Sequence, residues 1–193
     1  YGFESEFVGR LPVRAVFEKL TEEDLFEILK NPNNPIILGK KLDFAAYDID
    51  IKFEDAALRS LAKDAFNENT GARGLVSAVE QALMLFEKIL PASEVRKFPV
   101  TLAGLQEPQE TLDTLLDPVK REEIQESFAE LTRAEKETIR SYLGDNHLDL
   151  TRKHKLTLTQ ARIDLVADCY ATHIMDIGQV IERIKSSYDE IKK

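Results

Sequence analysis

The spacing of apolar residues in the first half of the chain switches between a helical and a strand-like period. Apolar side chains at positions 25, 28 and 29 follow Thr21 and three acids, which predicts a helix that stops at Asn31-Pro32. By the same criteria the sequence predicts helices over residues 35–46, 54–68 and 72–90, and strands over residues 11–17, 49–53 and 98–102. Phe66 is expected on the buried side of its helix. Residues 1–102 should therefore form an α+β unit.

The second half of the chain has only helical spacing. Residues 103–117 contain Gly104 and Pro108, are followed by Pro118, and are interpreted as the joint between two modules. A helix is expected over residues 118–143. Thr157 and Gln160 suggest a capping box before one long helix over residues 159–191. Apolar positions alternate at four and three residues along that helix, a heptad seam typical of a coiled coil: Ile163, Ala167, Tyr170, Ile174, Ile177, Ile181, Ile184, Tyr188 and Ile191.

This seam must be covered, and the sequence leaves several covers open. The 118–143 helix could pack against it as an antiparallel hairpin. A second copy of the chain or a foreign partner could cover it instead. A blander interpretation is that the extension packs back on the first unit and stabilises it.

Composition narrows the class of protein. The chain has 193 residues, with 26 basic and 35 acidic side chains, for a net charge of −9. Such an acidic chain lacks the footprint of a nucleic-acid binder. Its apolar runs are too short to cross a membrane, and one cysteine and no visible signal peptide favour the cytoplasm. The start at Tyr1 suggests a piece of something longer.

Few residues in the chain point to independent chemistry. No G-x-x-x-x-G-K-[ST] phosphate loop and no G-x-G-x-x-G motif occurs. His147, His154 and His173 are dispersed, so no metal site is expected. Cys169 and His173 lie near the seam and are interpreted as packing residues rather than a nucleophile and a base. The chain alone is therefore not expected to be catalytic.

Two arginines stand out by their context. Arg10 lies between an expected loop and an expected strand, and Arg73 lies in the first turn of an expected helix. A cation there opposes the helix dipole, yet it sets a rigid, permanently charged group where phosphate binds well. The alternative for each is a surface arginine with a carboxylate partner.

Three separate segments resemble one family. Residues 1–13 (YGFESEFVGRLPV) are similar to the G-[x]-x-P-E-F-x-G-R-L-P-V stretch of ClpX-type AAA+ unfoldases, with Ser5 in place of the usual proline. Residues 20–25 (LTEEDL) and 28–34 (ILKNPNN) resemble the first helix of the family's small domain. Residues 70–75 (TGARGL) resemble its sensor-2 motif. HslU is the next most similar family, and residues 103–193 resemble nothing that we can name.

The resemblance implies roles for four residues. Arg10 corresponds to the arginine finger, which reaches the γ-phosphate of ATP held by a neighbouring subunit. Arg73 corresponds to the sensor-2 arginine, which reaches ATP held by its own large domain. Leu20 and Ile28 fall where relatives contact the adenine, although core packing explains them equally well. ATP with Mg²⁺ is thus the cofactor implied for a full-length parent, with none expected for this chain alone.

The resemblance also implies an architecture and a function. Residues 1–12 would end the large AAA+ domain, 13–102 would form the small lid domain, 103–117 a linker and 118–193 a helical extension. The parent would be a cytoplasmic, homohexameric, ATP-dependent unfoldase whose partners are its own large domain, neighbouring subunits, the protein that it unfolds and a ClpP-type protease. The alternative is that the extension is a helical interaction or oligomerisation module that docks an adaptor or substrate.

Overall fold

The computed structural model describes residues 2, 4–10, 13, 15 and 18–191. Its first half follows the order of elements expected from the hydrophobic spacing. These elements are α1 (Ser5–Gly9), α2 (Glu22–Lys30), α3 (Pro35–Ala45), β1 (Asp50–Phe53), α4 (Asp55–Asn67), α5 (Arg73–Ile89), η1 (Leu90–Ala92) and β2 (Lys97–Val100). The second half consists of α6 (Leu102–Gln106), α7 (Pro108–Leu116), η2 (Pro118–Lys120), α8 (Arg121–Asp145), α9 (His147–His154), α10 (Gln160–Thr172) and α11 (Ile177–Ile191).

Side-chain caps define the starts of the first helices after the N-terminal segment. At α2 the amide of Asp24 donates to the hydroxyl of Thr21, and the amide of Thr21 donates back to the Asp24 carboxylate at 2.8 Å. This reciprocal pair confirms the predicted helix start. At α3 the side chain of Asn34 accepts from the amides of Ile36 and Ile37.

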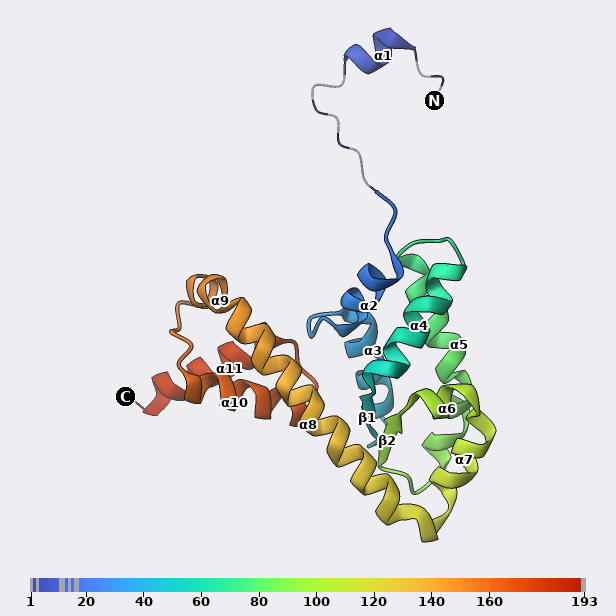
Figure 1. Cartoon of the computed structure of the whole chain (residues 1–193). Helices are drawn as coiled ribbons and strands as arrows, with labels where there is room; N and C mark the ends of the chain where they lie inside the picture. The colour runs from blue at the N-terminus through green and yellow to red at the C-terminus, as the bar shows by residue number, and fades with distance from the viewer. Residues whose placement is uncertain (1, 3, 11–12, 14, 16–17, 192–193) are drawn as a thin grey trace.

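Strands β1 and β2 form a parallel pair, with Asp50 opposite Lys97 and Phe53 opposite Val100. Parallel strands need a crossover, and α4 and α5 provide it. Helix α8 lies against both strands, so the sheet is enclosed rather than half-solvated (Figure 1). As a result Lys52 is buried, although it alternates along the strand with the apolar Ile51 and Phe53.

The first hydrophobic core fills the space between the helices and the sheet of residues 20–116. Phe98 of β2 lies at its centre, with ring centroids 5.7 Å from Phe44 and 4.6 Å from Phe86. Leu112 and Leu115 of α7 belong to the same core. The segment expected to join two modules thus folds into α6 and α7 and contributes side chains to the first unit. Phe66 is 43% exposed, so the prediction that it is buried was wrong.

The prediction of one long helix over residues 159–191 was also wrong. The chain forms α10, breaks at residues 173–176, and resumes as α11. The expected capping box at Thr157 is not what starts α10, because Thr159 is its N-cap residue and has no side-chain cap bond. A different capping box starts α11: the amide of Gln179 donates to Asp176, and the amide of Asp176 donates to the Gln179 side chain.

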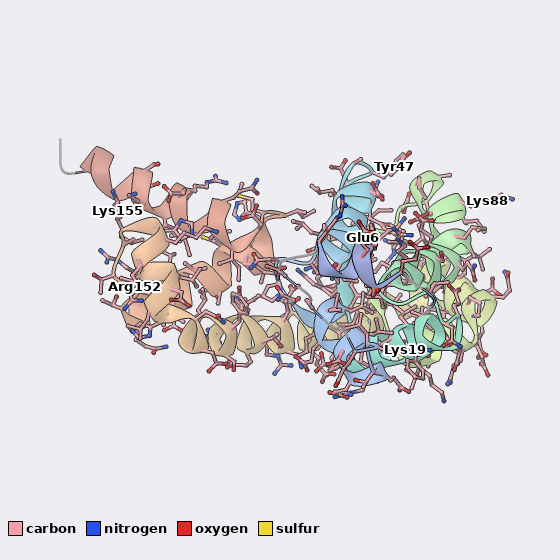
Figure 2. The ribbon with its side chains drawn as sticks, turned by 90° about the horizontal axis from the view of Figure 1, so that it is seen from above. Glu6, Lys19, Tyr47, Lys88, Arg152 and Lys155 are labelled. Atoms are coloured by element: carbon pink, nitrogen blue, oxygen red, sulfur yellow. The ribbon has the colours of Figure 1, made fainter. Side chains whose placement is uncertain are left out.

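A second hydrophobic core holds the extension together. Side chains of α8, α10 and α11 meet there, among them Ile139, Leu143, Ile163, Val166, Ala167, Tyr170, Ile177, Val180 and Ile181. The described part of the seam is therefore covered within the chain: α10 packs against α8, and after the break α11 packs against α10 and α9. Figure 2 shows α8 running from the first unit toward the end of the molecule where Arg152 and Lys155 lie.

The strand expected over residues 11–17 falls largely on residues outside those described, so it stays a prediction. Among the described residues, no helix combines the length and apolar character needed to cross a bilayer.

Candidate functional site: the exposed end of the small domain

Arg73 lies in the first turn of α5 and is exposed, as the sequence predicted. Two glycines shape the turn in front of it. Gly71 has φ +66°, a left-handed conformation that side chains rarely adopt. A Cβ on Gly74 would lie 2.7 Å from the Thr70 hydroxyl and 3.0 Å from the carbonyl oxygen of Ala65. Gly74 thus lets α5 approach the end of α4, and Arg73 stands outside that contact.

The charge around Arg73 suits an anion. The first turn of α5 contains no acid and has no side-chain cap. In the part of the chain that the structure describes, no carboxylate forms an ion pair with Arg73. The amides of Gly74 and Leu75 bond to the carbonyls of Gly71 and Ala72, so the guanidinium rather than those amides is available. A cation at the positive end of a helix dipole is electrostatically unfavourable, and a bound anion would compensate both positive charges.

Leu20 precedes helix α2 and Ile28 lies within it, in different environments. Leu20 precedes the helix and is 37% exposed, whereas Ile28 is half-buried and packs against the first core. Figure 1 shows that the start of α2 and the loop between α4 and α5 lie at the same end of this unit, where the N-terminal segment departs. Leu20 and Arg73 therefore belong to one exposed end of the domain, while the packing of Ile28 agrees with a core role.

Helices α2 and α4 are fixed to each other beside this end. Both guanidinium nitrogens of Arg59 bind the carboxylate of Glu23, at 2.6 and 3.2 Å. The Arg59 guanidinium carbon also lies 3.7 Å from the centroid of the Phe26 ring. The hydrogen bond from Arg59 lowers the pKa of Glu23, so this pair persists as charged groups.

Arg10 lies just after α1, apart from the rest of the domain (Figure 1). Its guanidinium binds Glu6 at 2.7 Å, and both side chains are more than three-quarters exposed. An ion pair so exposed to water contributes little stability and exchanges readily for a better anion. The structure does not bring Arg10 close to Arg73.

The three histidines and the cysteine of the chain lie in different environments. His154 is buried and its Nδ1 lies 2.9 Å from Glu182. His147 and His173 are exposed, and Cys169 is half-buried. No group of three or more His, Cys, Asp or Glu side chains gathers in the described ranges to hold a metal ion.

A buried charge cluster escaped the sequence analysis. The Glu135 carboxylate on α8 accepts from Lys41 of α3 and, at 2.7 Å, from Lys52 of β1. Lys52 also donates to the carbonyl of Ala171 on α10 at 2.8 Å. This cluster lies where the first unit meets the extension. Each of these three hydrogen bonds joins residues that are between 83 and 119 positions apart along the chain. The one sequence signal for this cluster would be a lysine at a buried strand position. The alternation of apolar and polar residues along the strand does not show that Lys52 is buried.

The cluster has two cations for one shared carboxylate, and the pKa values follow. Burial would raise the pKa of Glu135, but Lys41 and Lys52 together lower it below its usual value. Burial lowers the pKa of Lys41, because half of a carboxylate does not compensate its lost hydration. Burial raises the pKa of the nearby Asp50.

Further polar contacts tie the same two units together. The hydroxyl of Tyr170 donates to the carbonyl of Pro32 at 2.9 Å, and Lys41 lies over the Tyr170 ring. Asn33 bonds through its side chain to the Tyr142 hydroxyl at 2.9 Å. The extension is thus attached to the α2–α3 loop as well as to the sheet.

Comparison with known proteins agrees with this architecture. Residues 20–97 match the family model of the C-terminal, D2-small domain, of ClpB protein. The chain is 41% identical over 104 residues to the ATP-dependent Clp protease ATP-binding subunit ClpX of Borrelia duttonii, which covers 52% of this chain and 24% of the relative. It is 38% identical over 84 residues to the ClpX of Treponema denticola, covering 44% of this chain and 20% of that relative.

A third relative, ClpX 2 of Wolinella succinogenes, is 38% identical over 96 residues, or 49% of this chain and 24% of its own length. The chain therefore spans about a quarter or less of these curated relatives. The matched family model and the helices on a small parallel sheet describe the same unit. The chain carries a C-terminal small domain of the ClpX type of AAA+ protein.

Proposed function

We propose that the chain is part of a ClpX-like, ATP-dependent protein unfoldase, in which the small domain closes ATP sites completed by a large AAA+ domain. The observation that carries this proposal is Arg73, an exposed cation without a carboxylate partner in the described structure, positioned by Gly71 and Gly74. Its surroundings fit a phosphate group. Bound ATP with Mg²⁺ would supply the phosphoryl group and its charge.

Each arginine has a distinct role in this proposal. Arg73 holds negative charge on nucleotide bound by its own subunit. Arg10 leaves Glu6 and stabilises the phosphoryl charge in the site of the neighbouring subunit, across the ring. Leu20 contributes an apolar contact next to Arg73. A homohexameric ring in the cytoplasm, a protein substrate and a ClpP-type protease complete the proposed setting.

The test uses the full-length parent ring. Arg73→Ala and Arg10→Ala should each lower ATP turnover by about a thousandfold while the subunits stay folded. Arg121→Ala is the matched control, since Arg121 is exposed, pairs with Glu94 and lies outside the proposed site. Turnover at the wild-type level in either test variant would refute the assignment of that arginine.

Mixed rings separate the two roles. Arg10→Ala subunits combined with subunits that cannot bind ATP should regain hydrolysis, because intact fingers then face intact sites. Arg73→Ala subunits in the same mixture should not recover, because the defect stays within each ATP-binding subunit. Recovery of both variants, or of neither, would contradict the assignment. The chain alone should bind ATP weakly or not at all in a calorimetric titration.

A further inference from the structure

An apolar groove runs between α10 and α11 and is not used by the proposed ATP site. Its volume is about 380 Å³, and its floor consists of Leu165, Cys169, Val180 and Ile184. Leu165 is 40% exposed, a high fraction for a leucine in a helix that packs against two others. No residue of α8 lines this groove. It is therefore an apolar surface on the extension that is continuous with the second core, because Val180 and Ile184 belong to both.

The rim of the groove carries one guanidinium group, that of Arg183. Among the described residues its polar lining also includes His173 and Ser187 and contains no acid. The acids of α10 are engaged elsewhere: Asp164 pairs with Arg140 and Asp168 with Lys136, both on α8. A basic rim on a chain of net charge −9 marks this face as different from the rest of the protein.

Arg183 itself is available for an anion. Its Nη1 has the sulfur of Met175 at 3.9 Å as a side-chain acceptor, which is a weak partner for a guanidinium. Within the described residues no carboxylate forms an ion pair with it. A carboxylate brought to the rim would thus form a charge-assisted bond without displacing an existing one.

We propose that this groove binds an amphipathic helix of another protein, with apolar side chains on one face and carboxylates beside them. A channel between two helices accepts the apolar stripe of a third, with anchors spaced three and four residues apart. The lining runs from Leu165 to Cys169 on α10 and from Val180 to Ser187 on α11, so the groove accommodates about two helical turns. The apolar floor supplies affinity, and Arg183 selects acidic partners over basic ones.

Charge also argues against a second copy of the chain as the occupant. A symmetric contact of this groove with itself would place two copies of Arg183 at one interface. Like charges brought together in that way oppose association. An acidic helix instead complements the rim, so we commit to that occupant.

The test uses the full chain of 193 residues and a panel of helical peptides of about three turns. Panel members carry leucines at helical spacing flanked by glutamates, and matched peptides carry lysines instead of the glutamates. Fluorescence anisotropy measures binding. The rate of alkylation of Cys169, the single cysteine of the chain, reports independently whether the groove is covered.

The acidic peptides should bind in the micromolar range and slow the alkylation of Cys169, and the basic peptides should do neither. Arg183→Glu should weaken the acidic peptides at least tenfold and strengthen the basic ones. Arg183→Gln should weaken the binding of the acidic peptides without strengthening that of the basic ones. Arg152→Glu on α9, an exposed arginine that does not line the groove, is the control and should leave binding unchanged.

Three results would overturn the proposal. The first is no binding by any acidic member of the panel. The second is equal binding by Arg183→Glu and the unaltered chain, with both shown to be folded by circular dichroism. The third is a concentration-dependent doubling of mass that slows Cys169 alkylation without peptide, which would make a second copy the occupant. None of these outcomes depends on ATP, so the proposed function stands or falls separately.

Discussion

The ammonium group of Lys52 on β1 lies 2.7 Å from the carboxylate of Glu135 on α8, 83 residues further along the chain. Lys41 binds the other oxygen of the same carboxylate. Both lysines are buried, and the Glu135 side chain is 18% exposed. One buried carboxylate, shared between two cations from different elements, is therefore among the contacts that attach the extension to the small domain.

Replacement of Glu135 by glutamine should destabilise the protein strongly. The substitution keeps the size of the side chain but removes the carboxylate that both buried ammonium groups bind, and leaves Lys52 only its more distant pair with Asp50, at 3.7 Å. We expect a loss of about 3 kcal/mol in the free energy of unfolding, the lower end of the range for breaking a buried pair. Urea denaturation followed by circular dichroism measures it.

Glu137→Gln is the matched control for that measurement. Glu137 lies two residues later on α8, pairs with Arg140 and is 71% exposed. Its loss should leave the midpoint of unfolding nearly unchanged. Similar destabilisation by both substitutions would mean that the Lys41–Glu135–Lys52 cluster contributes no more than a surface ion pair.

Stability should fall on acidification because of the same carboxylate. The pKa of Glu135 is lower in the folded protein than its ordinary value of 4.5, so its contribution is complete above that pH. It is lost as the pH falls below about 4.5 and through the folded-state value. The raised pKa of Asp50 acts in the opposite direction, since protonation of that group favours the folded state.

Comparison of two proteins isolates the effect of Glu135 on this pH dependence. Unfolding free energies of the wild type and Glu135→Gln should converge as the pH is lowered from 7 toward 3. The lowered pKa of Lys41 affects stability only at alkaline pH, where loss of its proton removes a buried charge from the folded protein. Parallel curves for the two proteins across the acidic range would show that Glu135 is not the titrating group.

Substitution of either glycine beside Arg73 should be unfavourable for different reasons. Gly71→Ala forces a side chain into a left-handed conformation, at a cost of about 1–2 kcal/mol. Gly74→Ala places a Cβ 3.0 Å from a backbone oxygen of α4, and about 1–3 kcal/mol is expected for such overpacking. Thermal unfolding measures both.

Gly39→Ala is the control for the two glycine substitutions. Gly39 lies within α3, and a Cβ there would meet nothing within 4 Å. Since alanine favours the helix, this variant should be at least as stable as the wild type. A Gly74→Ala protein equally stable would show that α4 and α5 separate at no cost.

The double substitution of Ile177 and Ile181 by aspartate should unfold the second core. Both side chains are fully buried, and single large disruptions of a core already cost roughly 2–5 kcal/mol. Loss of α10 and α11 should appear as reduced helical circular dichroism and as protease cleavage after residue 145. Ser186→Asp, an exposed position on α11, should change neither. A double variant with unchanged melting and unchanged cleavage would contradict the burial of the seam.

The first half of the fold was readable because local signals and packing agree there. Thr21 and its acids begin α2, and Pro91 follows the last turn of α5, so caps and apolar spacing indicate the same boundaries. Arg73 was found because a cation in the first turn of a helix is conspicuous. Leu20 and Arg73 lie at one exposed end, although the sequence alone did not show that they share it.

The prediction of one long helix in the second half was wrong because the apolar spacing of the heptad seam continues in register across a break in the helix. Ile174 and Ile177 keep the three-residue spacing, but residues 173–176 are not helical. Helix α10 packs against α8, whereas α11 packs against α10 and α9. Asp176 and Gln179 were the readable signal, since they form the capping box that starts α11. Lys52 was unreadable, because the polar side of a strand is expected in water unless another element covers it.

Helix α8 touches both hydrophobic cores without interruption. Ile124 near its start packs against the first core, and Ile139 and Leu143 near its end belong to the second. Its 25 residues correspond to about 37 Å of helix. Such a rod acts as a lever arm: each tenth of a radian through which the small domain turns sweeps its far end through about 4 Å. A modest rotation at a nucleotide site would thus become a large stroke at the outer end of the extension.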